Sequence, residues 1–443
     1  MATPLQAARH ARGWSQPRAA WELTRLAQQK RVKVASSASL KTLLSRWENG
    51  HATPEHFYQD LLCGLYGAIP RELGFGTQSI PSDIASEGDY DVTLLSKRVW
   101  TRDDVSVLSD AFDEAINRSA SADVELLAHE WLSAEPPQLL ELGVGRRVGD
   151  SLITTLEHRV IQLRHADDYI SGRSSYVLVR QELSATTDLL RNAALTDDQA
   201  RRVLSAMGEL AQLAAWVAAD AGLYREASRY IQGGVVAANA ADDQPLAANI
   251  ISTFSYQLSN TGDPRRGAMI ARTAYAGARH TATAATKALL LERVAWGDAK
   301  SGDLASCRRS LGIVHETFDQ SNPSEDPSWV YWLSRQEIEV MEGRCLTELK
   351  QAAEAESVLR TAMEGYDRAI RENSLYLSWL AEDYVLLEEI ERAAEVAGRV
   401  LDLSIRANSA RTDERIRQLA GLLQRYSGVQ EVADFLDHYR AAS

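Results

Sequence analysis

A turn followed by a helix recurs at fixed spacing in the second half of this 443-residue chain. The phrases GLYREASRYI, GDPRRGAMIA and GDLASCRRSL begin at residues 222, 262 and 302, which are 40 residues apart. In each phrase a small residue follows the first glycine by five positions, at Ala227, Gly267 and Cys307. A repeat of this length cannot bury its own apolar face, so its copies must stack. The spacing therefore predicts an α-solenoid, with the small residue letting the two helices of one repeat approach closely.

The series extends beyond these three phrases. Ala355 and Ala393 occupy the same small position at spacings of 48 and 38 residues, and GVQEVADFL at 428–436 resembles a sixth, degenerate copy. Residues 122–443 show a helical apolar pattern with few prolines and almost no alternating strand pattern. We therefore expect an all-α protein.

The first 75 residues predict a separate bundle of short helices. Apolar residues at helical spacing mark helices over 5–12 and 16–29, and Ser39 is the expected N-cap of a third helix over 40–48. Pro54 starts a further helical pattern. The expected domains are a head at 1–75, a partly ordered linker at 76–121 with an extended segment near 92–100, leading helices at 122–200 that are candidates for dimerisation, and a repeat domain at 201–443.

Charge is segregated along the chain, although its net value is −13. Residues 1–46 hold nine basic side chains and one acidic one, whereas residues 76–443 hold 38 basic and 56 acidic groups. A small basic head on a large acidic body predicts an anionic partner for the head alone. We also expect the head to project away from the body, because an acidic surface repels DNA.

The helix that begins at Gln16 and the phrase LKTLLSRWENG at 40–50 resemble the helix-turn-helix domains of the lambda and 434 repressor class, the xenobiotic-response-element family. The resemblance covers roughly residues 4–75, with a longer connection between the second and third helices than the family has. It implies double-stranded DNA as partner, read by the third helix in the major groove. The alternative is a basic bundle that binds protein or nothing. The implied base contacts are Lys41, Thr42 and Arg46, and the implied phosphate contacts are Gln16, Asn49 and, from the long loop, Arg31 and Lys33.

The repeats resemble tetratricopeptide repeats over roughly residues 200–443. The match is one of pattern, because the spacings of 38–48 residues exceed the family's roughly 34 and its aromatic and proline consensus is mostly absent. In that family the first helix of each repeat lines a ligand groove. The head and the repeats together resemble actinobacterial regulators of development and secondary metabolism.

One inward-facing position in successive repeats predicts an aromatic ladder along the groove. Aromatic walls supply buried area, and amide side chains can satisfy the polar groups of a peptide. We therefore expect a peptide or a small molecule to bind there. The alternative is that the aromatic residues form core between repeats. The ladder position falls on Trp216, Tyr256, Trp296, Arg344 and Glu382, and Asn249, Ser252 and Asn260 lie on the same face.

Other kinds of site find little support in the sequence. Cys63, Cys307 and Cys345 lie too far apart for a disulfide framework or a CxxC metal site. No apolar segment reaches the length of a transmembrane helix, and the N-terminus lacks a secretory apolar region. No catalytic constellation or nucleotide motif is recognisable. We expect a cytoplasmic protein that is not an enzyme, uses no cofactor and binds no membrane.

These patterns support the hypothesis of a DNA-binding transcriptional regulator that senses a ligand. A homodimer is expected, because one recognition helix covers few base pairs and two heads on half-sites roughly 34 Å apart add affinity. The alternative is a protein-interaction scaffold, in which the repeats recruit a partner and the head only locates it on DNA. A sensor changes its DNA affinity when its ligand binds, and a scaffold does not.

Overall fold

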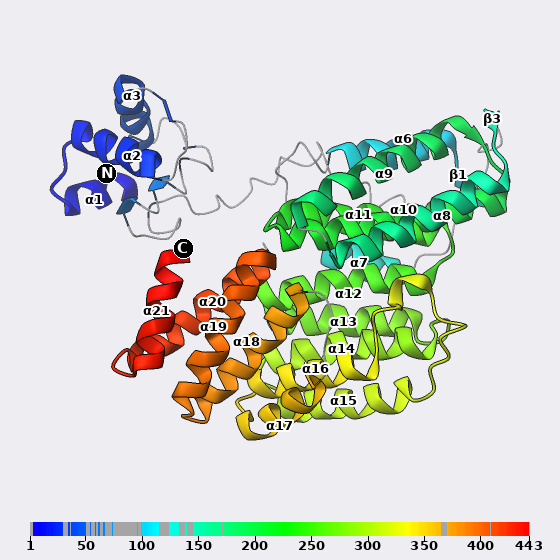
Figure 1. Cartoon of the computed structure of the whole chain (residues 1–443). Helices are drawn as coiled ribbons and strands as arrows, with labels where there is room; N and C mark the ends of the chain where they lie inside the picture. The colour runs from blue at the N-terminus through cyan, green and yellow to red at the C-terminus, as the bar shows by residue number, and fades with distance from the viewer. Residues whose placement is uncertain are drawn as a thin grey trace. The chain divides into compact units, whose positions relative to one another are not determined.

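The computed structural model divides the chain into two compact units, residues 1–87 and 88–443, which are described separately (Figure 1). The structure describes residues 3–29, 34–35, 37–49, 99–114, 124–132, 138–139, 145–169, 172–364, 370–407 and 409–442, with eight isolated positions between 54 and 95. The described elements are almost entirely helical, as the sequence predicts.

The first unit contains α1 (Pro4–Ala11), α2 (Gln16–Gln29) and α3 (Ser37–Glu48). Their apolar faces meet in a core of its own. The third helix begins earlier than the predicted cap at Ser39, which lies inside the first turn of α3. The run Ser-Ala-Ser allows this extension, because alanine favours the helix and serine is tolerated in a first turn. Most of the helix expected after Pro54 lies outside the described residues.

Six helix hairpins follow one another in the second unit, within its described part. Each pairs a long first helix with a second helix of similar or shorter length, and in Figure 1 helices α12 to α15 lie side by side as one layered stack. The hairpins are α10 (Asp197–Asp220) with α11 (Tyr224–Ala240), α12 (Gln244–Thr261) with α13 (Pro264–Ala278), α14 (Ala284–Lys300) with α15 (Leu304–Phe318), α16 (Arg335–Glu348) with α17 (Ala352–Ala362), α18 (Ile370–Leu386) with α19 (Ile390–Ala407), and α20 (Ala410–Leu423) with α21 (Gln430–Ala442).

The repeated small residue lies where the two helices of a hairpin touch. Ala227, Cys307, Ala355 and Ala393 are completely buried in the second helices of their hairpins. At Gly267 the space is tighter still, because a Cβ atom there would lie 2.1 Å from Ser259 Oγ of the paired helix. A larger side chain at this position would therefore force the hairpin apart.

Short strands and four helices precede the hairpins. Strand β1 (Val99–Trp100) pairs in parallel with β2 (Gln138–Leu139), and β3 (Arg146–Arg147) pairs with β4 (Ala193–Ala194). The helices are α6 (Arg102–Glu114), α7 (Val124–Trp131), α8 (Asp150–Asp167) and α9 (Gly172–Asn192).

Helix α6 lies in the range that the sequence suggested was a linker. Its buried residues Val105, Leu108 and Phe112 form one apolar stripe that packs against α9 and α11. Phe112 fits closely against Gly233, where a Cβ atom would come within 2.5 Å of the ring. Residues 102–114 therefore belong to the body. The extended segment expected near 92–100 coincides at its end with β1.

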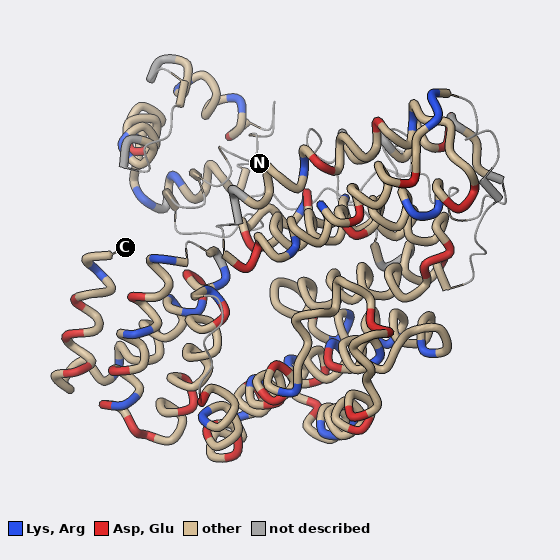
Figure 2. The backbone as a smooth tube through the Cα atoms, turned by 45° about the vertical axis from the view of Figure 1, so that its right-hand side comes forward, with Lys and Arg blue, Asp and Glu red and all other residues tan. Residues whose placement is uncertain are grey.

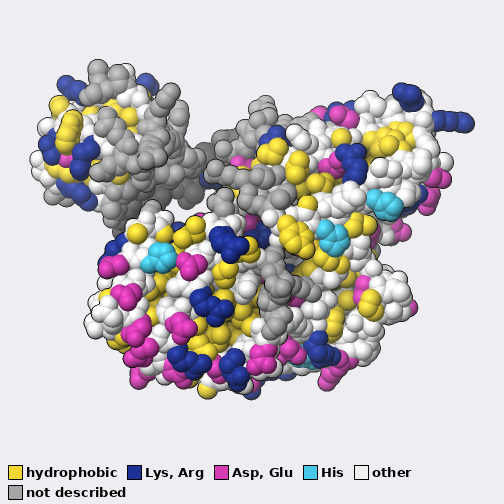
Figure 3. Space-filling model, in the orientation of Figure 1, with side chains coloured by type: hydrophobic (Ala, Val, Ile, Leu, Met, Phe, Trp, Pro, Cys, Tyr) yellow, Lys and Arg dark blue, Asp and Glu magenta, His cyan; other side chains and the backbone are white. Residues whose placement is uncertain are grey.

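Basic and acidic residues alternate along the body (Figure 2). On the face shown in Figure 3, Asp and Glu side chains interleave with Lys and Arg. None of the helices in the described part of the chain combines the length and the apolarity that crossing a membrane requires.

Candidate functional site

The exposed face of α3 carries the basic residues that the sequence singled out. Leu40, Leu44 and Trp47 are buried in the core of the first unit, whereas Lys41, Thr42 and Arg46 are exposed. The apolar spacing of the helix thus separates a packed face from a face that presents two cations. Such a face has the chemistry that contacts guanine edges or phosphates.

A buried carboxylate joins the three helices that the structure describes in this unit. Glu48 accepts hydrogen bonds from Arg9 Nε (2.6 Å) and Arg9 Nη2 (2.9 Å), and from Gln16 Nε2 (2.9 Å). Its side chain is completely buried, so this bidentate ion pair holds the end of α3 against α1 and the start of α2. Glu48, the first residue of the Glu-Asn-Gly phrase, therefore has a structural role.

The remaining predicted DNA contacts are placed differently. The Gln16 amide is engaged by Glu48, and Asn49 Nδ2 donates to the Ser45 carbonyl of its own helix at 2.7 Å. Arg31 and Lys33 lie outside the described residues. Of the seven residues, the structure therefore places Lys41, Thr42 and Arg46 together on one exposed helix face.

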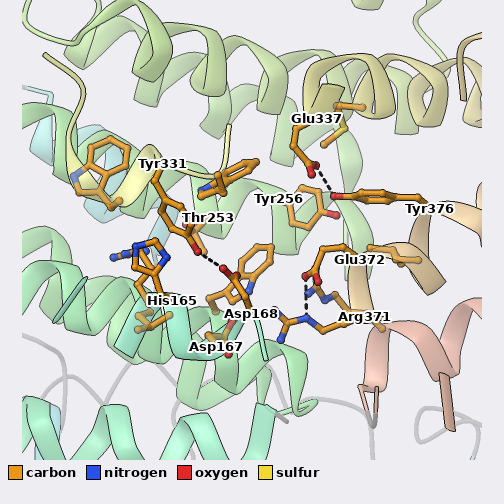
Figure 4. A pocket seen from close by; sticks show the side chains of 18 of the residues that line it. His165, Asp167, Asp168, Thr253, Tyr256, Tyr331, Glu337, Arg371, Glu372 and Tyr376 are labelled. Atoms are coloured by element: carbon orange, nitrogen blue, oxygen red, sulfur yellow. Dashed lines mark hydrogen bonds and ion pairs between the residues drawn. The ribbon is translucent and has the colours of Figure 1, made fainter. Parts of the chain in front are cut away.

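The second unit contains a cavity of about 700 Å³. Its walls come from the first helices of all six hairpins, from α8, from the end of α19, and from the segment between α15 and α16. Figure 4 shows side chains from separate elements converging around this space. The first helices of the hairpins supply most of the helical lining.

Four of the six residues expected to bind a ligand line this cavity: Trp216, Asn249, Tyr256 and Arg344. Trp296 is completely buried and does not line the cavity. Asn260 lies at the exposed end of α12, where its Nδ2 donates to the Tyr256 carbonyl at 2.7 Å. The helical turn after Tyr256 carries Asn260 past the edge of the cavity.

The predicted ladder position does bring side chains together in space. The ring centroids of Trp216 and Tyr256 are 6.0 Å apart with their planes at 29°, and those of Tyr256 and Trp296 are also 6.0 Å apart. Arg344 continues the column, with its guanidinium carbon 4.7 Å from the Trp296 ring. Glu382, the fifth position, pairs with Lys350 and Arg415 outside the cavity wall. The ladder thus forms cavity wall at Trp216, Tyr256 and Arg344 and core at Trp296.

An ion-pair network joins the first hairpin to the last two. Asp220, at the end of α10, accepts hydrogen bonds from Arg411 Nε (2.6 Å) and Ser409 Oγ (2.7 Å) and lies 3.5 Å from Arg371 Nη1. Burial alone would raise the pKa of Asp220, but Arg411 and Arg371 hold it below its usual value. Arg371 also pairs with Asp167 of α8 at 3.1 Å. These contacts link segments more than 150 residues apart and close the row of hairpins around the cavity.

A segment rich in aromatic residues covers another side of the cavity. Trp329, Tyr331 and Trp332, in and after the short 3-10 helix η2 (Ser328–Val330), all line it. Tyr331 Oη donates to Asp168 Oδ2 at 2.6 Å, and its ring lies 4.2 Å from the His165 ring (Figure 4). Sequence reasoning missed this segment because it lies between repeats. The run WVYW at 329–332 was the available signal.

Comparison with protein-family models and with curated proteins finds no match for this chain. Among the described residues, no cluster of three or more His, Cys, Asp or Glu side chains could hold a metal ion. The α3 face and the cavity are the candidate functional sites in the described part of the chain.

Proposed function

We propose that this chain is a sequence-specific DNA-binding transcriptional regulator, with a helix-turn-helix head and a tetratricopeptide-like body that senses a small ligand. The observation that carries the proposal is the α3 face, where Lys41, Thr42 and Arg46 project from a helix fixed by the buried Arg9–Glu48 pair. A rigid helix with cations at its exposed positions is what major-groove recognition needs. In this proposal the protein acts in the cytoplasm as a homodimer and controls development or secondary-metabolite genes.

The cavity supports a sensing role for the body more than a scaffolding one. Its volume of about 700 Å³ falls within the roughly 300–1,000 Å³ of small-molecule sites. The Asp220 network closes the hairpins around it, which favours a small molecule or a peptide of a few residues over a protein partner on an open groove. Binding of such a ligand would couple to DNA affinity through the geometry of the dimer.

Binding to fragments of the gene's own upstream region, with competitor DNA present, tests the DNA-binding function. We expect nanomolar binding by the wild-type protein and a loss of about 30- to 20,000-fold in the double variant Lys41→Ala, Arg46→Ala, since each of the two base contacts contributes about 1–3 kcal/mol. The matched control is Lys41→Arg, Arg46→Lys, which keeps the charge. It should retain salt-sensitive binding but lose preference for the operator, because lysine cannot make the bidentate contact of arginine.

Equal, weak binding by all three proteins, abolished by salt, would instead identify a non-specific basic patch. The scaffold function would then take precedence. Sedimentation with and without operator DNA tests the dimer: a monomer at micromolar concentration in both samples contradicts it.

A further inference from the structure

Two buried arginines in the cavity wall lack an ionised partner at hydrogen-bond distance. Arg344 is 5% exposed, donates through Nη2 to the neutral Tyr256 hydroxyl at 2.7 Å, and has its Nε buried without a hydrogen bond. Arg293 is 8% exposed, and its Nε is likewise buried without a partner. The carboxylate beside it, Glu292, lies 3.8 Å away. Burying an unpaired charge is unfavourable, so these two positions need an explanation.

Both guanidinium groups lie over the same aromatic ring. Their central carbons are 4.6 Å (Arg293) and 5.9 Å (Arg344) from the Tyr256 ring centroid. Arg411 lies 4.5 Å from the neighbouring Trp216 ring, and its Nη2 is also buried without a partner. Burial alone would raise the pKa of Tyr256, yet Arg344, Arg411 and Arg293 lower it to about 8. Positive potential therefore concentrates at this end of the cavity.

Most acidic side chains of the lining have partners other than Arg293 and Arg344. Asp168 accepts from Tyr331, and Glu337 accepts from Tyr376 (Figure 4). Asp167 and Glu372 both pair with Arg371. Glu292 adjoins Arg293 at 3.8 Å, and burial raises the pKa of Glu292 to about 7, so a large share of it is protonated near neutral pH.

We propose that the cavity binds a small molecule that carries an oxyanion on a flat apolar body. The oxyanion binds Arg293 and Arg344, and the flat body packs against Trp216 and Trp332. Two neighbouring guanidinium groups can bind one carboxylate, phosphate or sulfonate through charge-assisted hydrogen bonds. Such hydrogen bonds are strong where water is excluded. This inference deepens the proposed sensing role.

A pair of dyes tests the proposal on the full-length protein. The probe is 8-anilinonaphthalene-1-sulfonate, and its control is N-phenyl-1-naphthylamine, which has the same rings without the sulfonate. We expect one dye site per chain, at least tenfold tighter for the sulfonate, with an affinity that falls as salt rises. No saturable binding of either dye, or equal affinity for both, would overturn the proposal.

Variants place the dye in the cavity. Arg293→Gln and Arg344→Gln should each weaken sulfonate binding at least tenfold and leave the neutral dye unaffected. The charge-matched control is Arg308→Gln, an exposed arginine of α15 that should change neither affinity. Arg293→Lys keeps the cation and should retain part of the binding. It serves as the second variant if either glutamine variant fails to fold by circular dichroism. Sulfonate binding unchanged in every folded variant, or weakened equally by Arg308→Gln, would contradict the assignment.

Competition then identifies the oxyanion. Benzoate and phenyl phosphate should displace the sulfonate dye, and the better competitor distinguishes a carboxylate ligand from a phosphate ligand. Neutral benzamide should not compete, and equal competition by benzamide would contradict the proposal. None of these measurements uses DNA, so a failure here and a failure of the proposed DNA binding are distinguishable.

Discussion

The second unit, the body of the protein, contains two kinds of buried arginine. They have different partners but nearly the same solvent exposure. Arg371 and Arg415 are both 7% exposed, close to the 8% and 5% of Arg293 and Arg344. The first two form ion pairs at hydrogen-bond distance, Arg371 with Asp167 and Glu372 and Arg415 with Glu382, whereas the second two do not. Burial therefore does not explain the difference. The paired arginines neutralise the fold's own carboxylates, and the unpaired ones are available to an anion from outside.

The two kinds also occupy different places in the row of hairpins. Arg371 of α18 contacts α8 and α10, so its pairs join distant segments. Arg293 and Arg344 lie on α14 and α16, in the middle of the row, and contact mainly aromatic rings. The arginine whose ion pairs close the row of hairpins around the cavity is thus separate from the arginines that give the cavity its charge.

The largest expected effect on stability comes from removing a carboxylate that forms ion pairs with arginines. Asp220→Asn should lower the free energy of unfolding by about 3–5 kcal/mol, because it removes the buried carboxylate that pairs with the partly buried Arg411 and the buried Arg371. Urea titration with an unchanged m-value measures this. Asp402→Asn, on an exposed carboxylate, is the control and should change stability by less than about 0.5 kcal/mol. If Asp220→Asn changes the free energy of unfolding by a similarly small amount, the ion pairs of Asp220 do not stabilise the body.

The repeat architecture was largely predictable, because it depends on local chemistry. A turn glycine with a small residue five positions later marks three of the hairpins, and the small residue is buried at Ala227, Gly267, Cys307, Ala355 and Ala393. The head helices follow from apolar spacing in the same way. The ladder position also brought Trp216, Tyr256 and Trp296 together, since equivalent positions of stacked repeats are neighbours.

The closure of the cavity was not predictable, because it depends on pairs with no sequence period. Asp220 and Arg411 are 191 residues apart, and Tyr331 and Asp168 are 163 apart. No local pattern indicates which of many charged residues will meet across a superhelix. The same limit explains Trp296: periodicity places it on the inner column, but the packing of Trp379 at 5.6 Å decides that it is core.

The pH dependence of stability tests whether Arg293 is truly unpaired. Because the pKa of Glu292 is raised to about 7 in the folded state, its stabilising contribution is full below about pH 4.5 and is lost as pH rises through 7. Glu292→Gln is neutral at every pH, so its stability relative to wild type should rise between pH 5 and 8, by at most about 3 kcal/mol. Glu364→Gln, on an exposed carboxylate, is the control variant. If the difference in stability between Glu292→Gln and wild type does not change with pH, Glu292 is ionised in the folded protein. Arg293 would then have an ion-pair partner, as Arg371 and Arg415 do.

The smallest expected effect is also the most discriminating. Arg344→Met removes a buried cation that has no carboxylate partner and keeps much of the contact with Trp296. The lost hydrogen bond to Tyr256 costs about 1 kcal/mol, and relief of the unpaired charge offsets it, so stability should stay within about 1 kcal/mol of wild type. Arg371→Met, at nearly the same depth, should cost about 3–5 kcal/mol because it leaves Asp167 and Glu372 without their cation. Urea unfolding of both variants measures the difference directly. Equal losses would show that Arg344 serves the fold as Arg371 does, and the distinction between the two kinds of arginine would not hold.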